Sequence, residues 1–153
     1  MKNQIRIKNK NKYEIEVNDN GDTISFNLDD PELPLRFDDT FRRINDISSK
    51  MKAERVVIEK KKDEKTDGLL TKNERALYEM TNKYLKEMRK VMDGFLGEGA
   101  CDKIFGNANF PNMYEELLDQ LQPHFAKMKL DAEHYKKAVE EKYKEDEDED
   151  VLS

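Results

Sequence analysis

Residues 71–106 read TKNERALYEMTNKYLKEMRKVMDGFLGEGACDKIFG, and this stretch decides most of the fold. It opens with Thr71 and Glu74, whose spacing is that of the capping box at the start of a helix. Apolar residues then recur at spacings of three and four, which places them on one helix face: Leu77, Met80, Tyr84, Leu85, Met88, Val91, Met92 and Phe95. After a glycine-rich turn, residues 100–105 predict a short helix that Gly106 ends. The stretch therefore predicts a long amphipathic helix, a tight turn and a short helix.

A second amphipathic helix precedes this stretch and follows the hinge that Pro31 and Pro34 impose. We expect it to begin at Leu35 and to end between Lys60 and Lys65, because lysines suit the negative end of a helix dipole. Its expected apolar stripe consists of Phe37, Phe41, Ile44, Ile47, Met51, Val56 and Ile58.

A last helix follows the loop at residues 107–112. Helical spacing relates its apolar positions, which are Tyr114, Leu117, Leu118, Leu121, Phe125, Met128, Ala132, Tyr135 and Val139. Pro123 removes one backbone hydrogen bond and predicts that this helix is kinked or split there. Together the helices predict a helical body over residues 35–143.

Residues 2–28 follow a different pattern, because apolar and polar residues alternate in three short segments. The apolar members are Ile5 and Ile7, then Ile15 and Val17, then Ile24, Phe26 and Leu28. Alternation with a period of two places each set on one face of a β-strand. The Asn-Gly pair at residues 20–21 is typical of a hairpin turn. We therefore predict a three-stranded antiparallel β-meander whose apolar face must be covered, because so small a sheet is not stable alone.

The charge is unevenly distributed along the chain. The 153 residues include 28 Lys and Arg against 34 Asp and Glu, and the last nine residues hold six of those acids and no base. Residues 1–144 are therefore formally neutral. We expect residues 145–153 to be a disordered acidic tail that keeps a neutral domain soluble. The predicted fold is α+β: a single domain over residues 1–144 with a mostly α-helical body, the small N-terminal antiparallel β-meander, and this tail.

Composition excludes several classes of protein. No apolar run approaches the ~20 residues that span a bilayer, and the N-terminus lacks the apolar core of a signal peptide. Cys101 has no second cysteine with which to form a disulfide, which fits a reducing compartment. A body without net positive charge argues against general nucleic-acid binding. We expect a cytoplasmic protein with neither a membrane nor a nucleic acid as its partner.

Candidate catalytic and metal sites are weak. Cys101 lies near the start of a predicted helix, but a nucleophilic cysteine needs a base, and His124 and His134 stand in no recognisable signature. The Gly97-Glu98-Gly99 turn lacks the preceding strand and the glycine spacing of a nucleotide-binding motif. A buried thiol and a structural turn are the favoured interpretations. We expect no enzymatic activity, no cofactor and no metal.

Two N-terminal features also favour structural interpretations. Residues 18–22 (NDNGD) faintly resemble a calcium-binding loop but lack the glutamate that such a loop needs. Residues 2–12 carry five basic side chains and no acidic one. They suit a phosphate backbone, the acidic tail of a neighbouring molecule, or a charged edge strand that discourages self-pairing; we favour the last.

The chain has many flexible or aromatic apolar side chains for its small number of helices. Seven Met, seven Phe, six Tyr and no Trp form the stripes described above, and methionine-rich surfaces accept varied partners. Most of these side chains belong to the core. The remainder favours exposed apolar surface that accepts a partner helix or another subunit.

Residues 93–106, DGFLGEGACDKIFG, resemble a segment of the small tail assembly chaperones of Firmicutes siphophages and prophages. In that family a comparable F-G-E-G-x-x-x-K-I-F-G stretch follows a long helix. Here Leu96 stands between the aromatic residue and the glycine. The β-rich start, the charged helical middle and the acidic end are also similar.

The resemblance implies a non-enzymatic protein of the bacterial host's cytoplasm that binds the phage tape measure protein during tail assembly. It implies tail tube subunits as further partners, and a homo-oligomer is compatible with the apolar surplus. The candidate partner-binding residues are Phe95, Leu96, Ile104 and Phe105, which could instead lock the short helix onto the body. Two alternatives stay open: a structural virion component such as a head–tail connector or tail subunit, and an acidic protein that blocks a host DNA-binding protein.

Overall fold

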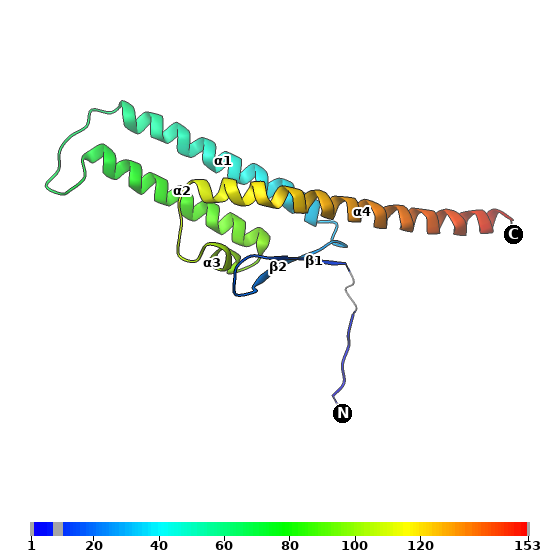
Figure 1. The fold of residues 1–153 in the computed structure, drawn as a ribbon. Helices are drawn as coiled ribbons and strands as arrows, with labels where there is room; N and C mark the ends of the chain where they lie inside the picture. The colour runs from blue at the N-terminus through cyan, green and yellow to red at the C-terminus, as the bar shows by residue number, and fades with distance from the viewer. Residues whose placement is uncertain (1, 8–10, 153) are drawn as a thin grey trace.

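The computed structural model describes the backbone of residues 2–7 and 11–152, and their side chains except at 130–136, 138, 139, 143 and 145–152. The elements are, in order, β1 (Lys12–Glu16), β2 (Thr23–Asn27), α1 (Leu33–Lys60), α2 (Lys72–Leu96), α3 (Ala100–Phe105) and α4 (Asn112–Leu152). The fold is mostly helical with an N-terminal antiparallel hairpin (Figure 1). The predicted α+β class is confirmed.

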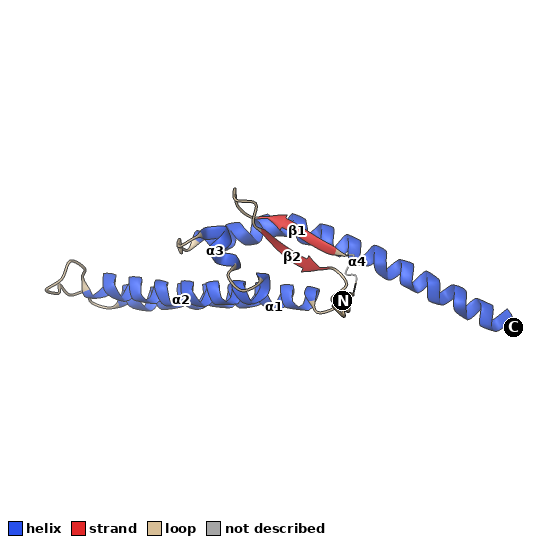
Figure 2. Ribbon diagram, turned by 90° about the horizontal axis from the view of Figure 1, so that it is seen from below, coloured by secondary structure: helices blue, strands red, loops and turns tan. Residues whose placement is uncertain are grey.

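The elements form two layers. The helices α1 and α2 run antiparallel and make one layer, and the hairpin, α3 and the first part of α4 lie together on one face of it (Figure 2). The second half of α4 extends beyond the body (Figure 1). One face of the α1–α2 layer is therefore covered by the rest of the chain.

The seam between α1 and α2 follows a heptad pattern. The core-facing positions of α1 alternate spacings of four and three, as in a coiled coil: Leu33, Phe37, Thr40, Ile44, Ile47, Met51, Glu54 and Ile58. Glu54 accepts a hydrogen bond from the hydroxyl of Tyr84 across this seam, and that bond raises the pKa of Tyr84 to about 12. A polar pair in such a seam fixes the register of the two helices. Phe41 and Val56 were predicted to lie on the stripe, but they fall off this narrow seam and are 37% and 49% exposed.

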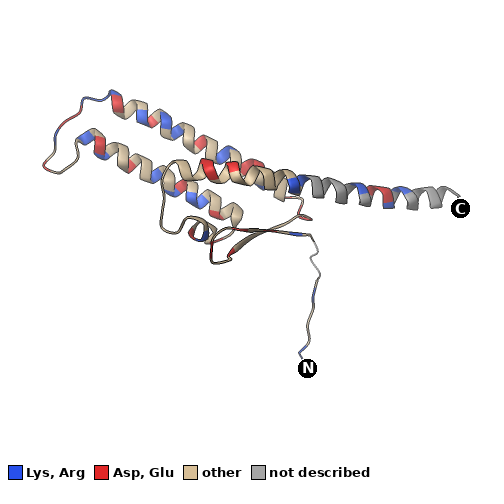
Figure 3. Ribbon diagram, viewed as in Figure 1, with Lys and Arg blue, Asp and Glu red and all other residues tan. Residues whose placement is uncertain are grey.

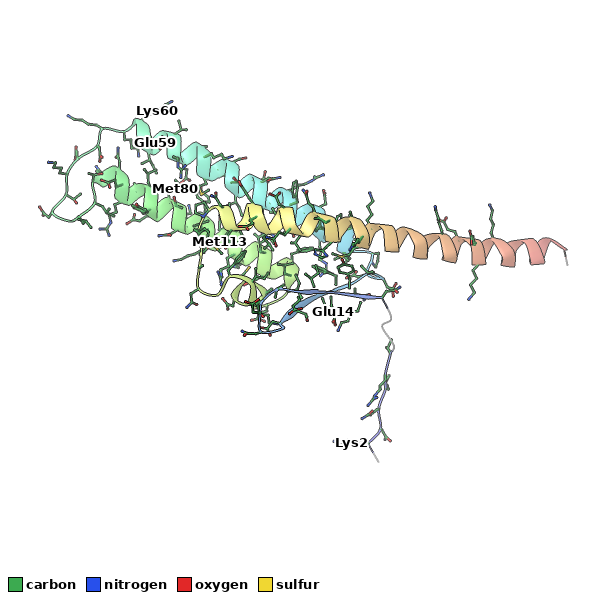
Figure 4. The ribbon with its side chains drawn as sticks, viewed as in Figure 1. Lys2, Glu14, Glu59, Lys60, Met80 and Met113 are labelled. Atoms are coloured by element: carbon green, nitrogen blue, oxygen red, sulfur yellow. The ribbon has the colours of Figure 1, made fainter. Side chains whose placement is uncertain are left out.

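The methionines that the structure describes belong to the core. Met51, Met80, Met88, Met92, Met113 and Met128 are all buried, and they pack with leucines of α2 and α4. Met80 of α2 and Met113 at the start of α4 are labelled in Figure 4. An unbranched thioether fills irregular gaps between helices, so the methionine-rich stripes join the two layers rather than form a binding surface.

The helix boundaries mostly agree with the sequence. The capping box is present, since Thr71 and Glu74 exchange side-chain and backbone hydrogen bonds. The short helix spans Ala100–Phe105 as predicted, and α1 ends at Lys60. However, α1 begins at Leu33 rather than Leu35, because Pro34 occupies its first turn, where a helix needs no backbone N–H donor.

The N-terminal sheet has two strands rather than three. In β1 and β2, Tyr13 pairs with Phe26 and Ile15 with Ile24. Residues 2–7 are extended but unpaired, with Ile5 and Ile7 94% and 91% exposed. Residues 8–10, which connect this segment to β1, lie outside the described residues. The prediction of a third strand was wrong, because alternation specifies only which side chains share a face. It does not specify a sheet edge with which the segment can pair.

The last helix also corrects two predictions. It is one helix from Asn112 to Leu152, so the split that was one of the two outcomes predicted at Pro123 does not occur. Pro123 and Asp119, whose carbonyl loses its helical donor, are both exposed, so water can satisfy that carbonyl. The backbone of residues 145–152 is helical, where composition predicted disorder. Extending a helix requires no new nucleus, and residues 124–152 contain neither Gly nor Pro.

Candidate protein-binding groove

The four candidate partner-binding residues are placed in the interior of the fold. Leu96 is buried, and Phe95, Ile104 and Phe105 are partly buried against the core. The ring of Phe105 meets that of Tyr114 edge to face, with centroids 5.7 Å apart. The structure thus gives all four residues a packing role, and Phe95 alone among them also lines the groove described below.

Phe95 belongs to a cluster of four phenylalanine rings from four elements, which we call the aromatic cluster. Its ring lies 5.6 Å from Phe26 of β2 and 5.6 Å from Phe37 of α1. Phe37 in turn stacks on Phe125 of α4, with centroids 3.8 Å apart and an interplanar angle of 9°. The aromatic cluster therefore joins the hairpin, α1, α2 and α4 at one point.

The short helix α3 is held by polar contacts from α2. Arg89 donates hydrogen bonds to Asp102 and to the carbonyls of Gly106 and Ala108, at 2.5, 2.6 and 2.9 Å. One turn further along α2, a carboxylate oxygen of Asp93 accepts the backbone N–H of Cys101 at 2.8 Å. These contacts account for Arg89, Asp93 and Asp102, the polar residues that hold α3 against α2. The segment is a structural turn, as favoured above.

Cys101 and the histidines make no catalytic arrangement among the described side chains. The Cys101 side chain is fully buried, and this burial, with the nearby Asp93 carboxylate, raises the pKa of its thiol to about 12. A thiol with that pKa is protonated and unreactive at neutral pH. The ring of His124 hydrogen-bonds the Tyr13 hydroxyl at 2.8 Å and joins β1 to α4. The side chain of His134 lies outside the described residues.

The calcium-like loop is held by its own asparagine. The side-chain oxygen of Asn18 accepts the backbone N–H groups of Asn20 and Asp22, and its amide donates to Asp22 and to the carbonyl of Lys103. Gly21 takes a positive φ of 81°, which the turn requires. No cluster of three or more metal-ligating side chains occurs in the described part of the chain. Likewise, no helix within residues 11–152 is long and apolar enough to cross a membrane.

An open groove of about 680 Å³ lies between α1 and α2. Its floor consists of Thr40 and Ile47 from α1 and of Val91, Gly94 and Phe95 from α2. Seven charged side chains form its rim: Arg36, Asp39, Arg43, Asp46 and Lys50 on α1, with Glu87 and Lys90 on α2. We call this feature the α1–α2 groove.

The groove lies on a different side of α1 from α4. Ile44, Ser48 and Met51 face a smaller cavity, of about 180 Å³, that residues of α4 also line. Arg43, Ile47 and Lys50, each adjacent to one of these residues, line the α1–α2 groove instead. Consecutive helical residues point about 100° apart. The groove therefore opens on the face of the α1–α2 layer that the second layer leaves uncovered.

The rim carries both signs of charge in a regular order. On α1, the cationic residues Arg36, Arg43 and Lys50 are seven residues apart, and Asp39 and Asp46 stand between them. Figure 3 shows Lys and Arg interspersed with Asp and Glu along both helices. Arg36 is paired with Asp30 at 2.5 Å, and the remaining rim residues form no ion pair with any described side chain. Their charges are therefore available to a helix in the groove.

The sequence predicted surplus apolar surface for a partner but did not locate it. The signal was the seven-residue recurrence of Arg36, Arg43 and Lys50 beside the core positions Thr40 and Ile47. That recurrence became informative only once α2 was known to lie against the same side of α1. Comparison of the chain with protein-family models, with curated proteins and with solved structures gives no match.

Proposed function

We propose that this protein is a non-enzymatic chaperone that holds an amphipathic helix of a client protein in the α1–α2 groove. The observation that carries the proposal is the groove itself, which combines an apolar floor with a charged rim on an uncovered face. A client helix would lay its apolar face on Ile47, Val91 and Phe95. From the resemblance to tail assembly chaperones, the client is the phage tape measure protein and the setting is the cytoplasm of the bacterial host.

The dimensions of the groove suit one helix. Arg36 and Lys50, at its two ends on α1, are separated by about 21 Å along the helix axis at 1.5 Å per residue. That length accommodates about four turns of a client helix. Apolar residues at positions i, i+3, i+4 and i+7 would meet the floor. A tape measure protein offers long amphipathic helices of this kind that need temporary cover.

The charge pattern suits a reversible complex. A rim with alternating signs favours a client whose flanking charges alternate in the same way, and mismatched charges weaken the wrong partner. The floor is short and is contributed by few apolar side chains. A small interface of this kind favours release, which a chaperone needs when tail tube subunits polymerise around the client.

Gly94 provides a sharp test because it lies on the floor with open space beside it. Apart from its chain neighbours and the backbone of its own helix, no atom lies within 4 Å of the position that a Cβ would occupy there, and its φ is not positive. Gly94→Trp should therefore fill the groove without disturbing the helix. Gly94→Ala is the matched control, since it adds one methyl group and leaves most of the groove open.

The experiment is co-expression of each variant with the tape measure protein, followed by measurement of client solubility and co-purification. We expect wild type and Gly94→Ala to keep the client soluble and in complex, and Gly94→Trp to lose both while keeping its own melting temperature. Unchanged client solubility with wild type would contradict the chaperone function. Equal activity of both variants would contradict the placement of the client in the groove.

The structural alternative has a separate readout. A head–tail connector or tail subunit stays in the finished particle, whereas a chaperone leaves before assembly ends. Mass spectrometry of purified virions distinguishes these outcomes, and finding this chain there at a fixed stoichiometry would favour the structural role.

A further inference from the structure

Residues 2–7 form an extended arm that makes no strand pairing in this chain. All six side chains are exposed, and the backbone leaves the sheet and points away from the body (Figures 1 and 4). Ile5 and Ile7 are almost fully exposed on this arm, with Gln4 and Arg6 on the alternate positions. An arm with one apolar face and one polar face is a strand that lacks a sheet.

The sheet has a free edge of matching character along β1. The backbone bonds from Leu28 to Asn11 and from Val17 to Asp22 continue the register of the hairpin. Because bonding alternates along an antiparallel pair, residues 11, 13, 15 and 17 bond toward β2. The backbone groups of Lys12, Glu14 and Glu16 therefore point outward, to an edge that no described strand occupies.

The arm and this edge are complementary in charge and in pattern. Glu14 and Glu16 are exposed acids on the outward positions of β1, and Arg6 is an exposed base on the corresponding face of the arm. An antiparallel pairing that sets Arg6 opposite Glu14 also sets Gln4 opposite Glu16. The same register brings Ile5 beside Ile15 and Ile7 beside Tyr13, on the face that packs against the helices.

We infer that the arm of one copy adds as a third strand to the β1 edge of a second copy. Every copy carries both an arm and an edge, so two copies can exchange arms reciprocally and close as a two-fold dimer. The exchange covers the exposed isoleucines and pairs the open β1 edge of each sheet, which is otherwise a site of uncontrolled pairing. In Figure 4 the arm, with Lys2 at its end, extends away from Glu14 of its own sheet, in a position suited to exchange. The inference is independent of the α1–α2 groove.

The test uses charge reversal in the full-length chain. Arg6→Glu places two acids at the contact, and Glu14→Arg places two bases there. Each contact occurs twice in the dimer, so each single variant should associate about tenfold or more weakly than wild type. Lys86→Glu, an exposed reversal on α2, makes the same change in net charge as Arg6→Glu and should associate like wild type. Sedimentation velocity over a range of protein concentrations measures all of them.

Mixing the two single variants decides between exchange and internal pairing. In a mixed dimer, the reversed arm of one copy meets the reversed edge of the other, and the unchanged arm meets the unchanged edge. Both contacts then join opposite charges, so we expect wild-type association to return. The inference would be overturned by an equimolar mixture that stays dissociated while a double variant, which carries both reversals in one chain, associates. It would also be overturned if the mixture stays dissociated and the arm of a monomer is protected from hydrogen exchange. A wild-type chain that is monomeric at every concentration would overturn it as well.

Discussion

Truncating Phe95 to alanine tests the role of the aromatic cluster directly. The Phe95 ring contacts Phe26 and Phe37, and through Phe37 it is linked to Phe125 of α4. Phe95→Ala removes the ring at the point where four elements meet. We therefore expect a loss of stability in the whole domain, rather than a local change in α2.

The magnitude follows from burial and ring geometry. Truncating a well-buried Phe to Ala costs about 3–5 kcal/mol, and each aromatic pair contributes about 0.5–1.5 kcal/mol of its own. Phe95 is only partly buried because it also lines the groove. We expect the free energy of unfolding to fall by about 3 kcal/mol, near the lower end of that range. Phe95→Leu keeps most of the apolar volume and should cost about 1 kcal/mol.

The measurement is urea unfolding followed by far-UV circular dichroism, with the free energy extrapolated at constant slope. Phe110→Ala is the matched control, because Phe110 lies in the loop before α4 and is 53% exposed. It should change the free energy of unfolding by less than about 0.5 kcal/mol. A double variant with Phe26→Ala should show coupling of about 1 kcal/mol between the two rings.

A free energy of unfolding for Phe95→Ala within about 0.5 kcal/mol of wild type, the range typical of a surface substitution, would contradict a structural role for the aromatic cluster. A stable Phe95→Ala variant that had lost client binding would instead make Phe95 a contact residue, as the sequence suggested. Loss of both properties would be explained by packing alone. Phe95→Leu would then show whether binding returns with stability.

Three further predictions concern residues outside the aromatic cluster. Cys101 should resist alkylation at neutral pH in the folded chain and react when the chain is denatured. Because folding raises the pKa of its thiol from 9.0 to about 12, the contribution of this thiol to stability is fully present below pH 9 and is lost as the pH rises toward 12. Arg89→Met should lower the free energy of unfolding by about 2 kcal/mol and accelerate amide exchange in α3, because it removes three hydrogen bonds that hold this helix. Arg75→Met breaks one exposed ion pair and should lower the free energy of unfolding by less than about 0.5 kcal/mol in the same urea experiment. Thr71→Ala should lower the free energy of unfolding by about 1 kcal/mol because it removes the capping box of α2. The control Ser49→Ala, at an exposed position, should leave the melting temperature unchanged.

The helices could be predicted from sequence because their signals are local. The capping box of Thr71 satisfies backbone donors at the start of α2, and the glycines around α3 allow the positive φ angles that its turns need. Both signals lie within a few residues of the feature that they determine. The third strand could not be predicted correctly, because pairing of Ile5 and Ile7 depends on a distant sheet edge. The absence of a split at Pro123 could not be predicted for a similar reason, since the cost of this proline depends on whether Asp119 is exposed.

The candidate site shows the same division. Sequence identified Phe95, Leu96, Ile104 and Phe105 as apolar residues around a tight turn, but apolar character is shared by core and interface. Only their contacts show that they pack inside the fold. Conversely, Asp39 and Lys50 appear in the sequence as ordinary surface charges, and the structure places them on the rim of the groove.

The sequence by itself determined the helical class, the cap, the turns and the hairpin, because propensity and periodicity act over one or two turns of chain. It also predicted that the single cysteine would be buried, as the structure shows. Only the tertiary structure decided which face of α1 meets α4 and which stays open, and whether the arm finds a strand to pair with. Those outcomes depend on how the two layers pack, and packing brings together surfaces from residues that are far apart in the chain.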